Sequence, residues 1–122
     1  MASETFPPNE KLRELLRGFP ESTVEACAEF QLTRSSEAFE RTFIGIIEHH
    51  LRQPLPQPLS KTPGSASLVA DLGLDSLSMT EMAFLFEDLF ATAVPHEDYI
   101  KVVTLDDLRR LLRARIPGLQ PA

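Results

Sequence analysis

Apolar residues recur along most of the chain at the three- and four-residue spacing of amphipathic helices, and no alternating strand pattern competes. This spacing predicts helices over residues 10–17, 23–31, 77–90, 97–101 and 105–116, with a further helix from residue 35 or 36 to 51. The clearest core stripe belongs to that further helix and comprises Phe39, Phe43, Ile46 or Ile47, and Leu51. The chain is therefore expected to be all-α.

Short polar residues that can cap a helix precede five of these segments. The candidates are Asn9, Ser22, Ser35 or Ser36, Asp75 or Ser76, and Thr104. Gly18 is expected to close the first helix, and Pro117 with Gly118 to stop the last one. Residues 1–8 are polar and include two prolines, so we expect a frayed end.

The first two predicted helices each have one apolar side, with Leu12 and Leu16 in the first and Val24 and Ala28 in the second. Two interpretations stay open for them: they pack on the rest of the body, or they dock a partner. Cys27 lies in the apolar pattern and is expected to be packed rather than reactive. As the single cysteine it excludes an internal disulfide framework and suits a reducing cytoplasm.

Two glycine- or proline-containing segments interrupt the helical pattern. Gly45 lies inside a predicted helix, where it costs up to ~1 kcal/mol relative to alanine, and we interpret it as allowing a close helix contact. Residues 54–67 are rich in proline, glycine and serine, and proline does not fit a helix interior. They predict a long structureless loop, which is unusual in a compact domain and favours a functional role.

The helix predicted over residues 77–90 is apolar on two faces rather than one. Its core stripe comprises Met79, Met82, Phe86, and Leu89 or Phe90. A second apolar line comprises Leu77, Thr80 and Phe84. Either the helix is buried on two sides or the second face meets a partner.

Composition narrows the class of protein. The chain has 122 residues, 43% of them hydrophobic, which fits one globular domain with an extension and excludes wholesale disorder. No apolar run approaches 18 residues, and the N-terminus lacks the features of a signal peptide, so no membrane span or secretion is expected. The net charge of −6 argues against nucleic-acid binding. Residues 68–107 alone carry −8, which favours basic partners.

The segment with the most specific chemistry is residues 71–77, which read D-L-G-L-D-S-L. This segment resembles the attachment motif of acyl carrier proteins, and the similarity extends over roughly residues 37–116. The resemblance implies that Ser76 carries a 4′-phosphopantetheine arm, added from coenzyme A by a phosphopantetheinyl transferase. Asp75 lies next to Ser76, and two roles stay open for it: it orients Ser76, or it holds the metal ion that the transferase needs.

Read without the resemblance, the same residues fit a helix start. A serine there exposes its hydroxyl, and the free N–H groups and dipole of the helix favour an attached phosphate diester. Asp75 and Ser76 can equally be only a cap. A calcium loop is rejected because its glycine would stand at the sixth position, and here Gly73 stands at the third. Neither a serine hydrolase nor a metal site at the three histidines is favoured.

The resemblance also implies an architecture. We expect an acyl-carrier-protein-like four-helix bundle with a short third helix, preceded by two small helices. The expected domains are an N-terminal helical extension over residues 1–34, an acyl carrier domain over 35–118 and a tail over 119–122. An extension of this kind is atypical of stand-alone acyl carrier proteins.

The expected function is carriage rather than catalysis, so the protein is expected not to be an enzyme. Ser76 would hold acyl intermediates as thioesters on the arm, for fatty-acid, polyketide or related lipid biosynthesis. The protein is expected to be a cytoplasmic monomer. Its expected partners are the transferase, acyl transferases and ketosynthases with basic docking surfaces. Three alternatives stay open: an aminoacyl or peptidyl carrier, an adaptor of the same fold that is never modified, and an unrelated helical interaction module.

The expected partner face is the second apolar line of the helix over 77–90. It comprises Leu77, Thr80 and Phe84, rimmed by Glu81, Glu87 and Asp88. In many fatty-acid carriers the position of Thr80 is a β-branched apolar residue, so the hydroxyl favours a different set of enzymes. Replacing Phe84 with alanine should leave folding nearly intact and weaken transfer to a synthase. An apolar acyl chain is expected to shelter between Met79, Met82 and Phe86 and the first bundle helix.

Overall fold

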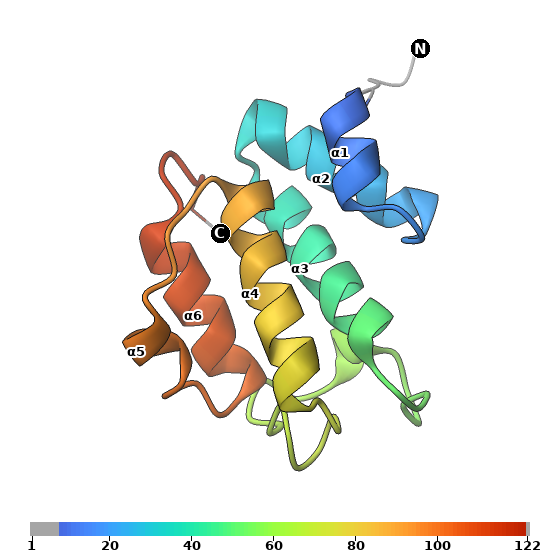
Figure 1. The fold of residues 1–122 in the computed structure, drawn as a ribbon, viewed down its shortest axis with the longest axis vertical. Helices are drawn as coiled ribbons and strands as arrows, with labels where there is room; N and C mark the ends of the chain where they lie inside the picture. The colour runs from blue at the N-terminus through green and yellow to red at the C-terminus, as the bar shows by residue number, and fades with distance from the viewer. Residues whose placement is uncertain (1–7, 122) are drawn as a thin grey trace.

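The structure, a computed structural model, describes residues 8–121 and folds them as packed helices (Figure 1). The elements are α1 (Glu10–Leu15), α2 (Glu21–Thr33), α3 (Ser36–His50), the 3₁₀ helix η1 (Leu59–Lys61), α4 (Ser76–Phe90), α5 (His96–Tyr99) and α6 (Leu105–Arg115). Within residues 8–121, extended pairing is limited to one isolated antiparallel bridge between Ser67 and Thr104. The predicted all-α fold is confirmed. The expected frayed end falls almost wholly on residues 1–7, which lie outside the described residues, as does residue 122 of the tail.

Four of the five predicted caps are confirmed. Asn9, Ser35, Asp75 and Thr104 each accept a hydrogen bond from the backbone N–H three residues later. The prediction for Ser22 is wrong, because α2 begins at Glu21 and leaves Ser22 inside its first turn. Pro20 precedes the helix instead, with a φ of −57° that proline fixes without help from a capping side chain.

A cluster of phenylalanine rings joins α2, α3 and α4 in the core. Phe30 of α2 meets Phe90 of α4 edge-on at 5.0 Å, and Phe39 of α3 lies 5.0 Å from the same ring. Phe43 and Phe86 stack at 5.9 Å between α3 and α4. Leucines of α6 complete this core, and all five rings are fully buried. The α2 helix is therefore part of the bundle. The N-terminal helices pack on the body, which is one of the two interpretations left open for them, and docking of a partner stays a prediction.

Gly45 marks the closest approach of α2 to α3. A Cβ atom added at Gly45 would lie 2.5 Å from Oγ1 and 2.9 Å from Cγ2 of Thr23, which is itself buried. Real side chains do not approach so closely, so only glycine fits with Thr23 in this position. The predicted role of Gly45 in a close helix contact is confirmed.

The segment between α3 and α4 is more ordered than its composition predicts. The 3₁₀ turn η1 forms after Pro58, whose carbonyl accepts from the N–H of Lys61 at 2.9 Å, and it buries Leu59. Further along, Leu68 donates to Val103 at 2.9 Å, and Ala66 accepts from Leu105 at 3.0 Å. The prediction of a structureless loop is therefore wrong. Proline tolerates the start of a short helical turn, and leucines anchor the remainder.

The segment after α4 matches its prediction to within two residues. A single helical turn, α5, follows Pro95 and buries Tyr99. The hydroxyl of Tyr99 donates to the carbonyl of Met79 in α4 at 2.7 Å. No helix within residues 8–121 is long and apolar enough to cross a membrane.

Candidate functional site

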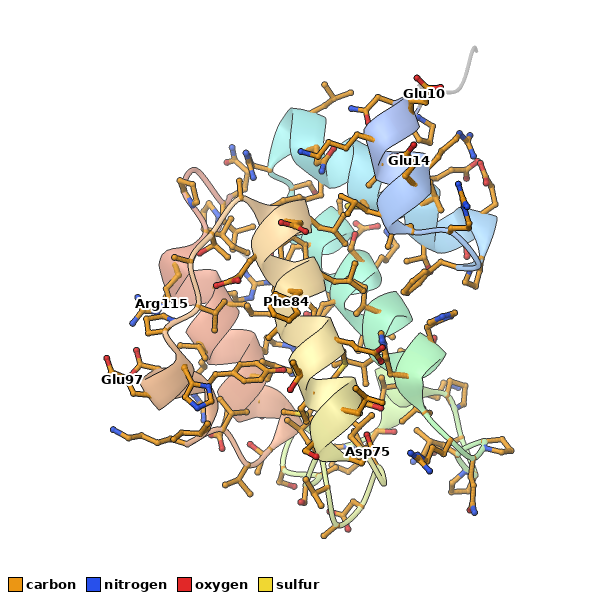
Figure 2. The ribbon with its side chains drawn as sticks, in the orientation of Figure 1. Glu10, Glu14, Asp75, Phe84, Glu97 and Arg115 are labelled. Carbon is orange, nitrogen blue, oxygen red and sulfur yellow. The ribbon has the colours of Figure 1, made fainter. Side chains whose placement is uncertain are left out.

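Ser76 is the first residue of α4, at the end of the helix where Figure 2 labels Asp75. Gly73 makes the preceding turn with a φ of +75°, a region that suits glycine. Leu72 and Leu74 on either side of Gly73 are buried, so this turn is pinned to the core. Ser76 itself is exposed. The sequence thus folds locally to present one hydroxyl at a helix N-terminus.

Asp75 is the cap of α4 and is paired on both of its oxygens. Its Oδ1 accepts from the N–H of Ser78 at 2.8 Å, and its Oδ2 pairs with the guanidinium of Arg52. Hydrogen bonding to Ser78 is the main cause that lowers the pKa of Asp75, and the charge of Arg52 lowers it further. Asp75 is therefore ionised at neutral pH and holds the first turn of α4. The sequence did not single out Arg52.

A cleft of about 730 Å³ opens beside Ser76, between α4 and α5. Apolar side chains form most of its lining, among them Val69, Met79, Ala83, Tyr99 and Val102. Ser76 and Asp75 also contribute to this lining. Burial raises the pKa of Tyr99, and its hydroxyl already donates to the carbonyl of Met79 in α4.

The open space lies on a different side of α4 from the one the sequence suggested. Met82 and Phe86 are fully buried in the core, where Phe86 stacks on Phe43 of α3, and only Met79 of the three named residues lines the cleft. A parting of the core between α3 and α4 stays a prediction. The cleft toward α5 needs no such parting.

The predicted partner face is exposed in the middle and less uniform at its rim. Leu77 and Phe84 are each 64% exposed, and Figure 2 shows Phe84 partway along α4. Thr80 is also exposed, but its hydroxyl donates to the carbonyl of Ser76 at 2.9 Å. Its polar atom is therefore engaged by its own helix.

The acidic rim of this face divides into two kinds. Glu81 and Asp88 are exposed, whereas Glu87 is half-buried and accepts from the N–H of Val94 at 2.8 Å. Glu87 therefore fastens the connection between α4 and α5. The sequence could not separate these roles, because the contact with Val94 forms only when the chain turns back after α4.

The N-terminal extension reaches the partner face through its α1–α2 turn. Phe19 in this turn stacks on His49 of α3 with ring centroids 3.8 Å apart. Phe19, His49 and His50 line a hollow of about 580 Å³ together with Glu81 and Phe84 of α4. Sequence reasoning missed Phe19, because its position in a turn gives no periodic signal.

The residues at Ser76 fit a covalently attached phosphate-linked arm. The hydroxyl is exposed, and the N–H groups of the first helical turn stabilise a phosphate diester beside it. The adjoining cleft offers an apolar wall to what the arm carries. Among residues 8–121, no three histidine, cysteine, aspartate or glutamate side chains are grouped so that they could hold a metal ion.

Comparison with known proteins gives a consistent answer. The family described as the phosphopantetheine attachment site matches residues 55–112. The acyl carrier proteins of Rhodopseudomonas palustris and Nitrobacter winogradskyi are each 32% identical over 77 residues, which is 63% of this chain and 91% of theirs. No solved structure matches significantly. The chain therefore belongs to the acyl carrier protein family and contains the family's site for covalently attached 4′-phosphopantetheine.

Proposed function

We propose that Ser76 is the attachment residue and that this chain carries acyl groups as thioesters on its arm. The observation that carries the proposal is the exposed hydroxyl of Ser76 at the start of α4, directly beside an apolar cleft. When attached, the arm supplies a terminal thiol that binds acyl groups. The protein contributes position and shelter rather than catalysis, and a tethered group meets each enzyme at raised effective concentration.

The attachment step would use the transferase as catalyst and coenzyme A as donor. Oγ of Ser76 forms a bond to the phosphorus next to pantetheine, and the pyrophosphate P–O bond of coenzyme A breaks. Adenosine 3′,5′-bisphosphate leaves, and the proton of Ser76 passes to a base of the transferase. The chain contributes the exposed hydroxyl and the positive end of α4, which stabilises the diester formed there.

The cleft favours an acyl chain over an aminoacyl or peptidyl group. Val69, Met79, Ala83 and Val102 give it an apolar wall, and the one buried hydroxyl, that of Tyr99, is bonded to the backbone. A polar cargo would find few hydrogen-bond partners there, whereas a hydrocarbon chain would be removed from water. Fatty-acid, polyketide or related lipid synthesis fits this lining.

The partner face would meet enzymes with an apolar spot ringed by arginine or lysine, such as acyl transferases and ketosynthases. Leu77 and Phe84 supply exposed apolar surface, and Glu81 with Asp88 supply exposed negative charge. We propose that Phe19 enlarges this face, because it lines one hollow with Phe84. The extension over residues 1–34 would then contribute to partner choice as well as to the core of the carrier domain over 35–118.

A reducing, cytoplasmic setting and a monomeric state belong to the same proposal. Cys27 is fully buried, and burial raises the pKa of its thiol to about 12, so it stays protonated and shielded. This fits a chain that functions with its single cysteine reduced. The monomer is proposed because an exposed apolar face on α4 is what the partner enzymes need.

The test is the intact mass after incubation with coenzyme A, magnesium and a broad-range phosphopantetheinyl transferase. The wild type and Ser78→Ala, two residues further along the same turn, should each gain one phosphopantetheine. Ser76→Ala should gain none. A folded wild type that gains no mass would instead support an adaptor that is never modified. A gain on Ser76→Ala would move the attachment residue elsewhere.

A further inference from the structure

Arg52 pairs with Asp75, the residue before Ser76, although it is distant in sequence and outside the attachment motif. Its Nη2 donates to Oδ2 of Asp75, the residue that caps α4. This contact brings a guanidinium to the N-terminus of the helix that presents Ser76. The side chain of Arg52 is 69% exposed, and among residues 8–121 its Nε and Nη1 groups have no hydrogen-bonded acceptor. The Nε and Nη1 groups of Arg52 can therefore donate hydrogen bonds to a further acceptor.

The backbone is restrained on both sides of Arg52. Helix α3 ends at His50, and the N–H of Leu51 donates to the carbonyl of Glu48 at 3.2 Å. Leu51 is half-buried against the core, so the backbone is anchored directly before Arg52. Pro54 then limits the chain on the other side, since proline fixes its own φ and restricts the residue before it.

The segment that contains Ser76 is strongly acidic, so a cation near Ser76 would have an electrostatic role. Residues 51–107 hold nine carboxylates, and their only lysines and arginines are Arg52, Lys61 and Lys101. A diester on Ser76 would place a second anion next to the ionised Asp75, and two neighbouring anions repel each other. A cation that contacts both would offset that repulsion. Arg52 is the cation already paired with Asp75.

We propose that Arg52 binds the phosphodiester on Ser76 and bridges it to Asp75. This inference rests on the proposed attachment at Ser76. Guanidinium is suited to the role because its five N–H donors form a planar fork that contacts two anionic oxygens at once. Arg52 would thereby be a positioning residue. It restrains the arm at its root, while Asp75 continues to cap α4 through its other oxygen.

The experiment compares apo and holo forms of four proteins: the wild type, Arg52→Gln, Arg52→Lys and Arg13→Gln. Arg13 is the matched control, since it is an exposed arginine that pairs with Glu21 at 3.1 Å in the extension. Intact mass first confirms that each protein takes up one phosphopantetheine. The arginine Nε–H resonances and the ³¹P resonance of the arm are then recorded by NMR. Urea unfolding of every form completes an apo–holo cycle at low and at high salt.

The expected result is a shift of the Arg52 Nε–H resonance on modification, with no comparable shift for Arg13. The ³¹P resonance of Arg52→Gln should differ from that of the wild type. In the cycle, Arg52→Gln should lower the holo-to-apo ratio of folding constants by about two- to fivefold, as expected for an exposed ion pair. Arg52→Lys should restore part of this coupling, and high salt should abolish it.

Failure of the bridge can be distinguished from failure of the proposed attachment. Suppose that all four proteins gain mass, but modification does not shift the Arg52 Nε–H resonance, and Arg52→Gln changes neither the ³¹P resonance nor the folding cycle. The bridge is then wrong and the proposed attachment stands. If the folded wild type gains no mass, both the attachment and the bridge are overturned. An effect of Arg13→Gln as large as that of Arg52→Gln would also overturn the bridge, because the coupling would then reflect general charge.

Discussion

The α2 side and the α5 side of the bundle are held by contacts of different kinds. Helix α2 has 13 residues, places Phe30 in the aromatic core and approaches α3 closely at Gly45. Helix α5 has four residues and buries only Tyr99. Its remaining ties are polar and near the surface, such as the ion pair of Asp98 with Arg115 at 2.7 Å.

This difference indicates that the α2 side stabilises the fold, whereas the α5 side can admit an acyl chain. The α2 side is packed without a cleft at its phenylalanine contacts, so any opening there would break buried apolar contacts. On the α5 side the cleft already exists, and a single helical turn has little stability of its own. An acyl chain that enters beside α5 therefore disturbs few contacts, while α2 and α3 keep the fold intact.

The largest expected effect comes from breaking the dense side at Phe30. Phe30→Ala should lower the free energy of unfolding by about 3–5 kcal/mol, because it removes a fully buried ring and leaves a cavity. Urea unfolding of the apo protein measures this value. The matched control is Phe84→Ala on the exposed face of α4, which should leave the unfolding midpoint nearly unchanged and weaken acyl transfer to a synthase.

Two outcomes of these unfolding measurements would contradict the assignment of Phe30 to the core and of Phe84 to the exposed face. If Phe84→Ala destabilised the fold as much as Phe30→Ala, Phe84 would belong to the core and the partner face would be misassigned. If Phe30→Ala had little effect, the extension would be an appendage rather than part of the bundle.

A smaller effect is expected when the close contact at Gly45 is overfilled. Gly45→Ala should destabilise by about 1–3 kcal/mol through the clash with Thr23, although alanine favours helix by up to ~1 kcal/mol. The double variant Gly45→Ala with Thr23→Ala removes the two closest of the clashing atoms, Oγ1 and Cγ2 of Thr23. It should be more stable than the sum of the two single changes indicates. Simple additivity in this double-mutant cycle would mean that the two helices do not meet at Gly45.

The sequence predicted what is local. The cap at Asp75, the start of α4 and the attachment motif all lie within a few residues, and the hydrogen bond from Ser78 that fixes them spans three positions. The side of α4 that contains Phe86 followed from helical period alone. The error at Ser22 was also local, because Pro20 sets the helix start two residues earlier than the serine would.

What escaped prediction depends on chain reversals. Arg52 reaches Asp75 across 23 residues of proline-rich chain, and nothing in the motif indicates where that chain returns. Phe19 meets His49 because the turn between α1 and α2 lies against α3. The cleft depends on how far the short α5 stands from α4, which a periodic pattern does not specify.

The smallest expected effect sharpens the comparison through pH. Hydrogen bonds from the N–H groups of Thr104 and Val103 lower the pKa of Asp107 below its ordinary value of 3.8. The folded state thus favours the ionised form. The contribution of Asp107 to the free energy of unfolding is complete above that ordinary value and is lost as pH falls through the lowered pKa. Acid should therefore loosen the segment between α5 and α6 first.

Amide hydrogen exchange followed from pH 6 down to pH 3, corrected for intrinsic rates, measures this loosening. Protection of Val103 and Thr104 should fall before that of α2 and α3. Asp107→Asn should be less protected at pH 6 and should flatten the pH dependence. Asp88→Asn, an exposed carboxylate with no hydrogen bond among the described residues, should keep the wild-type slope. Equal loss of protection on both sides of the bundle would show that the α5 side is no weaker than the α2 side, and the cleft would then need another account of how it admits its cargo.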